Sequence, residues 1–138
     1  MDKYQRALLE LYRAKKAVMK INQEIGYSLD LSRQAAEVSW EKDQFGLPEP
    51  PKEWRDIGGK NLWLHLAYQK EYSVYEGMYY VNHDDDVRGY LAEHCGHALH
   101  AHDLIQARKE LRKELGIAKR RVTFLGNKLL RSMEVSNG

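Results

Sequence analysis

The chain has 138 residues, 43% of them hydrophobic and 30% charged, with one cysteine and a formal net charge of +2. This length suits one globular domain with a buried core, and no apolar run reaches the roughly 18 residues that a membrane span needs. One cysteine excludes an internal disulfide, and residues 1–6 lack the apolar core of a secretory signal peptide, so we expect a cytoplasmic protein with no membrane partner.

Charge is unevenly distributed along the chain. Residues 1–26 carry six Lys/Arg and three Asp/Glu, a balance of +3, and residues 104–138 carry nine against three, a balance of +6. Residues 27–103 carry seven against fourteen, a balance of −7. Because two basic segments flank an acidic middle, we expect the two ends to lie together and away from the middle.

The N-terminal segment predicts a helix that begins near Lys3, because Asp2 is a favoured N-cap. Apolar residues then recur at intervals of seven in two rows, which is the heptad seam of a coiled coil. The rows are Tyr4, Leu11, Val18 and Ile25, and Ala7, Ala14 and Ile21. Gly26 interrupts this pattern, and a second helical piece is predicted from Leu31 to about Asp43.

The next segment is a predicted connection. All three prolines lie in residues 44–53, which we interpret as a surface connection, and residues 54–59 read as a further loop or turn. Helical spacing of Leu, Trp and Tyr then favours a helix from Lys60 to about Tyr75. A strand is the alternative for the later part, because residues 73–81 are rich in Tyr and Val.

Residues 82–87 form an acidic turn in this interpretation. Asp84, Asp85 and Asp86 offer caps for a short helix from Val87 to about His94. The same carboxylates could bind a divalent cation, but they lack the glycine and distal glutamate of a calcium loop. Helix capping in a solvated turn is therefore the preferred role.

The C-terminal segment holds the longest helical pattern, from residue 99 to residue 131. Two rows at intervals of seven again form a seam, and seven of its eight positions are apolar. The rows are Leu104, Leu111, Ala118 and Leu125, and Arg108, Leu115, Val122 and Leu129. Gly116 and Gly126 each cost about 1 kcal/mol relative to Ala in a helix, and we expect residues 132–138 to be frayed.

Together the two seams predict a mainly α fold. Residues 1–43 and 99–131 would form a long antiparallel helical hairpin, and residues 44–98 a smaller middle helical subdomain, all within a single domain of residues 1–138. Neither helix has enough apolar surface to be stable alone, so pairing explains both patterns. A homodimer through the same seams is the alternative.

A cluster of histidines with the single cysteine is the first candidate site. Thiolate sulfur and imidazole nitrogen are the donors that zinc prefers, so any metal here is expected to be zinc, held by the thiolate and two imidazoles. The candidate ligands are Cys95, His94, His97, His100 and His102. The alternative is that these histidines lie on or cap a helix while Cys95 packs in the core. No other cofactor is indicated.

A basic stripe on the C-terminal helix is the second candidate site. Its candidate partner-binding residues are Arg108, Lys109, Arg112, Lys113, Lys119, Arg120 and Arg121. Such a stripe could contact nucleic-acid phosphates, an acidic protein surface, or only solvent. The sequence contains no recognised nucleic-acid motif, and its net charge is low for a dedicated nucleic-acid domain. No nucleophile elbow, phosphate loop or His-Glu-x-x-His helix is present, so we expect a protein that is not an enzyme.

Three short segments resemble small helical accessory proteins encoded by tailed bacteriophages and their prophages. They are Tyr90-Leu-Ala-Glu-His-Cys, His100-Ala-His-Asp-Leu-Ile-Gln-Ala-Arg-Lys and Leu115-Gly-Ile-Ala-Lys-Arg-Arg-Val, and the resemblance covers roughly residues 88–130. It implies a second cysteine three positions after the first, where this chain has Ala98. It also implies a product that acts in the host cytoplasm by binding a bacterial or phage protein.

Overall fold

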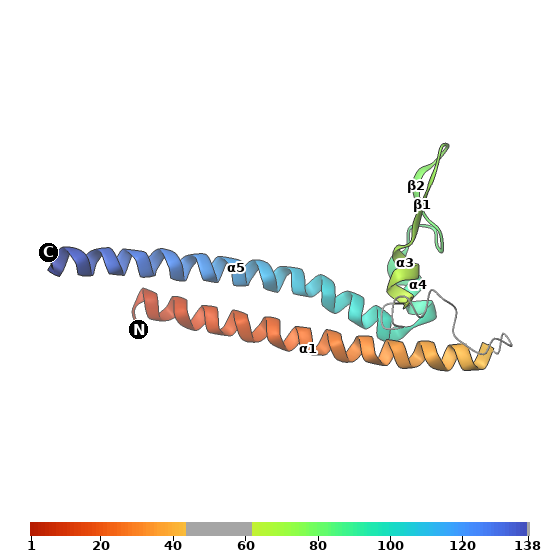
Figure 1. Cartoon of the computed structure of the whole chain (residues 1–138), viewed down its shortest axis with the longest axis horizontal. Helices are drawn as coiled ribbons and strands as arrows, with labels where there is room; N and C mark the ends of the chain where they lie inside the picture. The colour runs from red at the N-terminus through yellow and green to blue at the C-terminus, as the bar shows by residue number, and fades with distance from the viewer. Residues whose placement is uncertain (44–61, 138) are drawn as a thin grey trace. The chain divides into compact units, whose positions relative to one another are not determined.

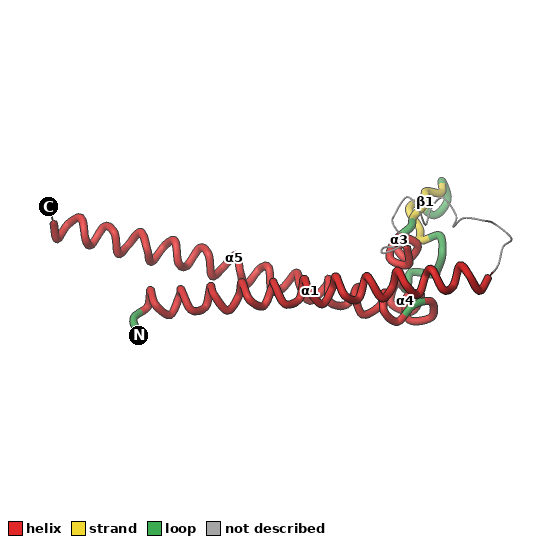
Figure 2. The backbone as a smooth tube through the Cα atoms, turned by 60° about the horizontal axis from the view of Figure 1, so that its bottom comes forward, coloured by secondary structure: helices red, strands yellow, loops and turns green. Residues whose placement is uncertain are grey.

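The computed structural model describes residues 1–43 and 62–137 and is mainly helical (Figures 1 and 2). Its elements in chain order are α1 (Lys3–Asp43), α3 (Leu62–Tyr68), β1 (Lys70–Ser73), β2 (Gly77–Tyr80), α4 (Val87–His94) and α5 (Gly96–Asn137). The predicted connection at 44–53 and the turn at 54–59 lie outside the described residues. None of the helices in the described ranges is both long and apolar enough to cross a membrane.

The chain divides into two compact units. Met1–Gln23 and Ile105–Gly138 form one, which we call the basic unit, and Glu24–Leu104 form the other, which we call the acidic unit. The basic unit carries fifteen Lys/Arg and five Asp/Glu, a formal charge of +10, and the acidic unit carries seven against fifteen, a charge of −8. The boundary falls inside α1 and α5, whereas the sequence placed it after residue 43 and before residue 99.

The basic unit is the predicted antiparallel pairing of the N- and C-terminal helices, which the structure confirms (Figure 1). Ala7, Ile21 and Ala118 are buried in its seam, Leu111, Leu115, Val122 and Leu125 are half-buried, and Leu129 is exposed. The one polar position of the seam, Arg108, donates from Nη1 to Asn22 Oδ1 at 2.9 Å. That hydrogen bond favours one register of the two helices.

Both long helices are more continuous than predicted. α1 runs through Gly26 without a break, because this position is exposed and an added Cβ would meet nothing within 4 Å. Similarly, α5 begins at Gly96 and extends to Asn137, past the end that was expected to fray. The predicted cap of α1 is confirmed: Asp2 Oδ1 accepts from the Gln5 backbone N–H at 2.7 Å, and Gln5 Oε1 accepts from the Asp2 N–H at 3.1 Å.

The acidic unit has the denser core. Ala67, Leu91, Cys95 and Ala98 are buried together, and partly buried residues of α3 and α4 pack around them. α4 follows the predicted bounds, with Asp86 as its N-cap. Cys95 has an extended backbone that ends α4 and precedes α5, since its N–H donates to Leu91 O and its carbonyl accepts from Leu99 N–H.

The predicted helix from Lys60 to Tyr75 is wrong beyond Tyr68. α3 ends there, and β1 pairs with β2 as an antiparallel two-stranded sheet with Lys70 opposite Tyr80 and Ser73 opposite Gly77. Gly77 has φ of 74°, a conformation that suits glycine, and it closes the turn between the strands. Tyr and Val favour strands, so the alternative interpretation was the right one for this stretch.

Candidate functional site

The structure separates the five predicted zinc ligands. The His94 ring stacks on Trp63 at a centroid distance of 5.4 Å and contacts Tyr90 at 4.3 Å. The thiol of Cys95 is buried and lies 3.9 Å from Ser32 Oγ of α1. The side chains of His97 and His100 are exposed on the first turns of α5.

His102, the last of the five, is buried in a hydrogen-bonded chain that sequence spacing did not reveal. Its Nδ1–H donates to Asp103 Oδ1 at 3.3 Å, so its Nε2 accepts from the Tyr68 hydroxyl at 2.5 Å. Arg88 donates from Nε and Nη2 to the two oxygens of Asp103, at 3.0 and 2.8 Å. The chain thereby ties α3, α4 and α5 together.

This chain of residues is suited to structural support. Burial, with a further contribution from Tyr80, raises the pKa of the Tyr68 hydroxyl, which therefore stays protonated at neutral pH. Both ring nitrogens of His102 have partners within the protein, so its two hydrogen bonds link α3 to α5. Within residues 1–43 and 62–137, no group of three or more His, Cys, Asp or Glu side chains is placed to hold a metal ion. The zinc prediction gains no support from this geometry.

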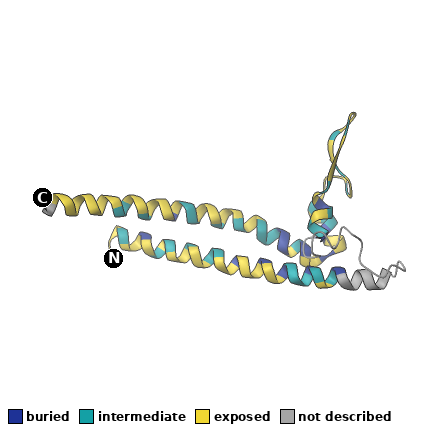
Figure 3. Cartoon of the chain, in the orientation of Figure 1, coloured by how far each residue is buried: buried dark blue, intermediate teal, exposed yellow. Residues whose placement is uncertain are grey.

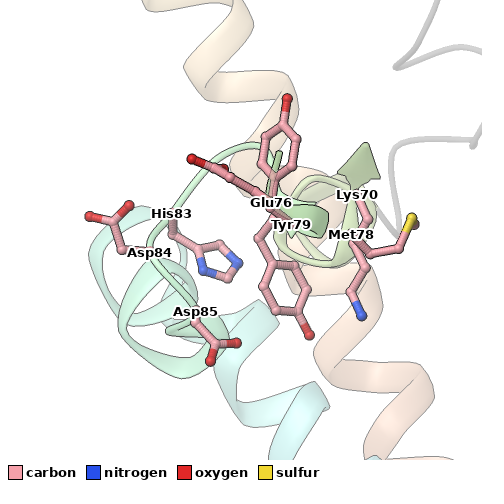
Figure 4. Close-up of a pocket in the computed structure, with 8 residues that line it drawn as sticks. Lys70, Glu76, Met78, Tyr79, His83, Asp84 and Asp85 are labelled. Carbon is pink, nitrogen blue, oxygen red and sulfur yellow. The ribbon is translucent and has the colours of Figure 1, made fainter. Parts of the chain in front are cut away.

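A pocket of about 460 Å³ lies beside the β-hairpin (Figure 4). Tyr79, Tyr80 and Met78 of β2 line it together with Lys70 of β1, Glu76 of the turn, and His83, Asp84 and Asp85 of the following loop. In Figure 4 the His83 ring lies between the aspartates on one side and Lys70 on the other. The pocket therefore combines aromatic walls with three carboxylates.

Rings and side-chain hydrogen bonds fix the base of the hairpin. His83 stacks on Tyr80 at 4.6 Å, and it lies 5.5 Å from the ring of Tyr90 on α4. His83 Nε2–H donates to the Ala67 carbonyl at 2.7 Å, while its Nδ1 accepts from the Asp86 N–H at 2.9 Å. Asn82 Nδ2 donates to the Leu66 carbonyl at 2.7 Å. These donors satisfy carbonyls at the end of α3 that have no partner within the helix.

The seven predicted partner-binding cations differ in whether their side chains already have hydrogen-bond or ion-pair partners. Arg108 belongs to the helix seam, and Arg121 pairs with Glu10 at 3.0 Å. Lys109 and Lys113 bond to neighbours one turn away on α5. The remaining three are exposed, and within the described residues none has an ion pair: they are Arg112, Lys119 and Arg120.

Helical spacing places some of these cations in one row with two exposed apolar residues, on the solvent-facing side of α5, and one of the two, Ile117, lies at the edge of the row, where it also lines a groove between the helices. We call this row the α5 outer face, and it consists of Lys109, Lys113, Ile117, Arg120, Phe124 and Arg131. Ile117 is 59% exposed and Phe124 is 67% exposed. Beside Ile117 a groove of about 350 Å³ between the helices has alanine side chains from both, Ala14, Ala17 and Ala118.

No family model, curated protein or solved structure matches the chain. The β-hairpin pocket and the Tyr68–His102–Asp103–Arg88 chain are the features that sequence reasoning missed. The Tyr-rich stretch followed by three aspartates was a local signal for the pocket. The hydrogen-bonded chain had none, because its partners come from three separate helices.

Proposed function

We propose that this chain is a non-enzymatic bacteriophage accessory protein that acts in the cytoplasm of its host. It binds a host or phage protein through the α5 outer face and inhibits or regulates it. The phage setting rests on the resemblance of residues 88–130, and host-defence, nuclease and transcription complexes are the target classes that this setting suggests.

One observation carries the proposal: Ile117 and Phe124 are more than half exposed within a row of cations. Water-exposed apolar side chains surrounded by charge are typical of interface anchors, and aromatic anchors contribute much of the binding energy of many interfaces. The chemistry of the row fits an acidic partner surface with an apolar pocket. A helix face of this pattern can also lie in a groove of the partner.

Nucleic acid is the second candidate partner, and the +10 charge of the basic unit favours it. Lysine and arginine on one unit can neutralise phosphates with release of counterions. Phosphate contacts do not need exposed Ile or Phe side chains, however. The two functions therefore differ in which residues they use.

The test compares three double variants of the full chain in capture from bacterial lysate and in binding to duplex DNA. Ile117→Ser with Phe124→Ser removes the apolar anchors and keeps the charge. Lys113→Ser with Arg120→Ser removes two cations from the α5 outer face. Arg112→Ser with Lys119→Ser is the matched control, because it removes two exposed cations from the rest of α5.

For a protein partner, the first two variants should bind the captured protein at least about 30-fold more weakly, as expected for loss of an anchor worth about 2 kcal/mol. The control should change binding much less. If the partner is nucleic acid, the two charge variants should lose DNA affinity equally, and the apolar variant should keep its DNA affinity. Tight DNA binding with a log–log salt slope of about −0.9 per phosphate, and no captured protein, would reverse the assignment.

A further inference from the structure

Most residues of the β-hairpin of the acidic unit are exposed (Figure 3), and several of them have large apolar or aromatic side chains. Tyr72 is 70% exposed, Val74 84%, Tyr75 98% and Met78 63%. Neither face of the sheet carries a buried residue. A two-stranded hairpin is only marginally stable alone in water, so apolar side chains in this setting indicate a surface that a partner covers.

The hairpin is also held in place at its base. The His83 ring joins Tyr80 of β2 to Tyr90 of α4, and the His83 and Asn82 side chains bond to backbone carbonyls of α3. A surface fixed in this way loses little conformational freedom on binding.

The charge around the hairpin selects the partner. Residues 70–86 contain five carboxylates, Glu71, Glu76, Asp84, Asp85 and Asp86, and one cation, Lys70. The Lys70 ammonium lies 4.6 Å from the centroid of the Tyr80 ring, on which His83 also stacks, so this one cation is already in use and the carboxylates of the loop are in excess. Aromatic rings beside carboxylates are the chemistry that recognises lysine and arginine side chains.

We propose that the β-hairpin and the loop that follows it form a second docking surface, separate from the α5 outer face, for a basic segment of a partner protein. One cationic side chain of the segment pairs with the carboxylates of Glu76, Asp84 and Asp85 in the pocket, and the exposed Tyr72 and Met78 contact the rest of the segment. Arginine is favoured over lysine, because its planar guanidinium can stack on a tyrosine and pair with a carboxylate at the same time.

The test uses the full chain and three synthetic peptides, (Arg-Gly)₄, (Lys-Gly)₄ and (Gln-Gly)₄, with titration followed by NMR. The arginine peptide should bind most tightly and the glutamine peptide should not bind. Asp84→Asn with Asp85→Asn should weaken binding at least about fivefold, as should Tyr72→Ser with Met78→Ser. Asparagine tolerates the left-handed backbone of Asp85, whose φ is 64°, so the loop keeps its form.

The matched control is Glu24→Gln with Glu134→Gln, which removes two exposed carboxylates outside the hairpin and should change affinity less than twofold. Equal weakening by this control would overturn the proposal, because attraction would then follow total charge. Absence of binding by both basic peptides would also overturn it. Self-association lost on changing Tyr72 and Met78, seen by sedimentation, would assign the surface to a second copy instead. None of these outcomes bears on the α5 outer face, so the two proposals fail independently.

Discussion

At the scale of single residues, Asp103 is the group whose ionisation the fold changes most clearly within the described part of the chain. Hydrogen bonds from the Arg88 guanidinium lower the pKa of this carboxyl from 3.8 to about 2. In the interval between these values the unfolded chain binds the proton more readily, so the stability from the pair is complete above about pH 4 and is lost as pH falls toward 2. We expect the Tm of the wild type to fall more steeply from pH 5 to 2 than that of Asp103→Asn, as followed by circular dichroism.

Arg88→Met provides the matched control for this prediction. It removes both the cation and its hydrogen-bond donors but keeps an unbranched side chain, so the pKa of the Asp103 carboxyl should rise toward its ordinary value, as measured by NMR. The pair is partly exposed, with 63% and 42% of the two side chains accessible, so its contribution to stability is that of a screened surface pair. If Asp103 still titrated near pH 2 in this variant, Arg88 would not be the main cause of the lowered pKa.

Two glycines, also at this scale, should respond to alanine with opposite signs. A Cβ at Gly89 would collide with the Asp86 carboxylate, which caps α4 by accepting from the Gly89 N–H at 2.9 Å. Gly89→Ala should therefore give a net destabilisation, because the lost cap and the clash outweigh the up to about 1 kcal/mol that alanine gains over glycine in a helix. Gly26→Ala meets nothing within 4 Å and should stabilise α1 by up to about 1 kcal/mol. Urea unfolding of both variants measures the difference, and a gain in stability from both would show that Asp86 does not act as the cap.

At the scale of elements, the seam of the basic unit makes a graded prediction. Leu111 in the seam is half-buried, so Leu111→Ala should cost about 1–2 kcal/mol, below the roughly 2–5 kcal/mol of a fully buried leucine. Ile117 on the outer face should cost no more than about 0.5 kcal/mol when changed to Ala. Leu91 of the acidic unit is 0% exposed, so Leu91→Ala should show the larger loss of unfolding free energy, roughly 2–5 kcal/mol, that is expected for a fully buried leucine. Equal losses at Leu111 and Ile117 in urea unfolding would contradict the assignment of the seam.

At the scale of the whole molecule, the two compact units are also the two oppositely charged parts of the chain. The net charge of +2 combines a basic unit of +10 with an acidic unit of −8. Like charges within each unit repel, and the buried seam side chains of the basic unit are few and mostly small. An acidic partner bound to the basic unit and a basic partner bound to the acidic unit would each relieve that repulsion. Each of the two proposed surfaces therefore binds a partner of opposite charge to its own unit.

The sequence by itself predicted the helix faces that pair and the local caps, and the structure decided that the two faces pair within one chain. A heptad seam repeats the same contact along each helix, so the rows of Leu111 and Val18 predicted their pairing without tertiary information. Asp86 caps α4 through a residue three positions away, which is also a local pattern. The charge segments likewise anticipated the basic and acidic units.

Only the tertiary structure decided what the middle of the chain and the histidines do. Tyr-rich residues 70–80 support helix and strand about equally by local pattern, and the turn at Gly77 with the stacking at Tyr80 selected the hairpin. His94 and His102 were both predicted as zinc ligands, but their partners are Trp63 and Tyr68, which lie some thirty residues earlier in the chain. The spacing of residues along one segment does not specify such distant contacts, because they exist only once separate helices have packed together.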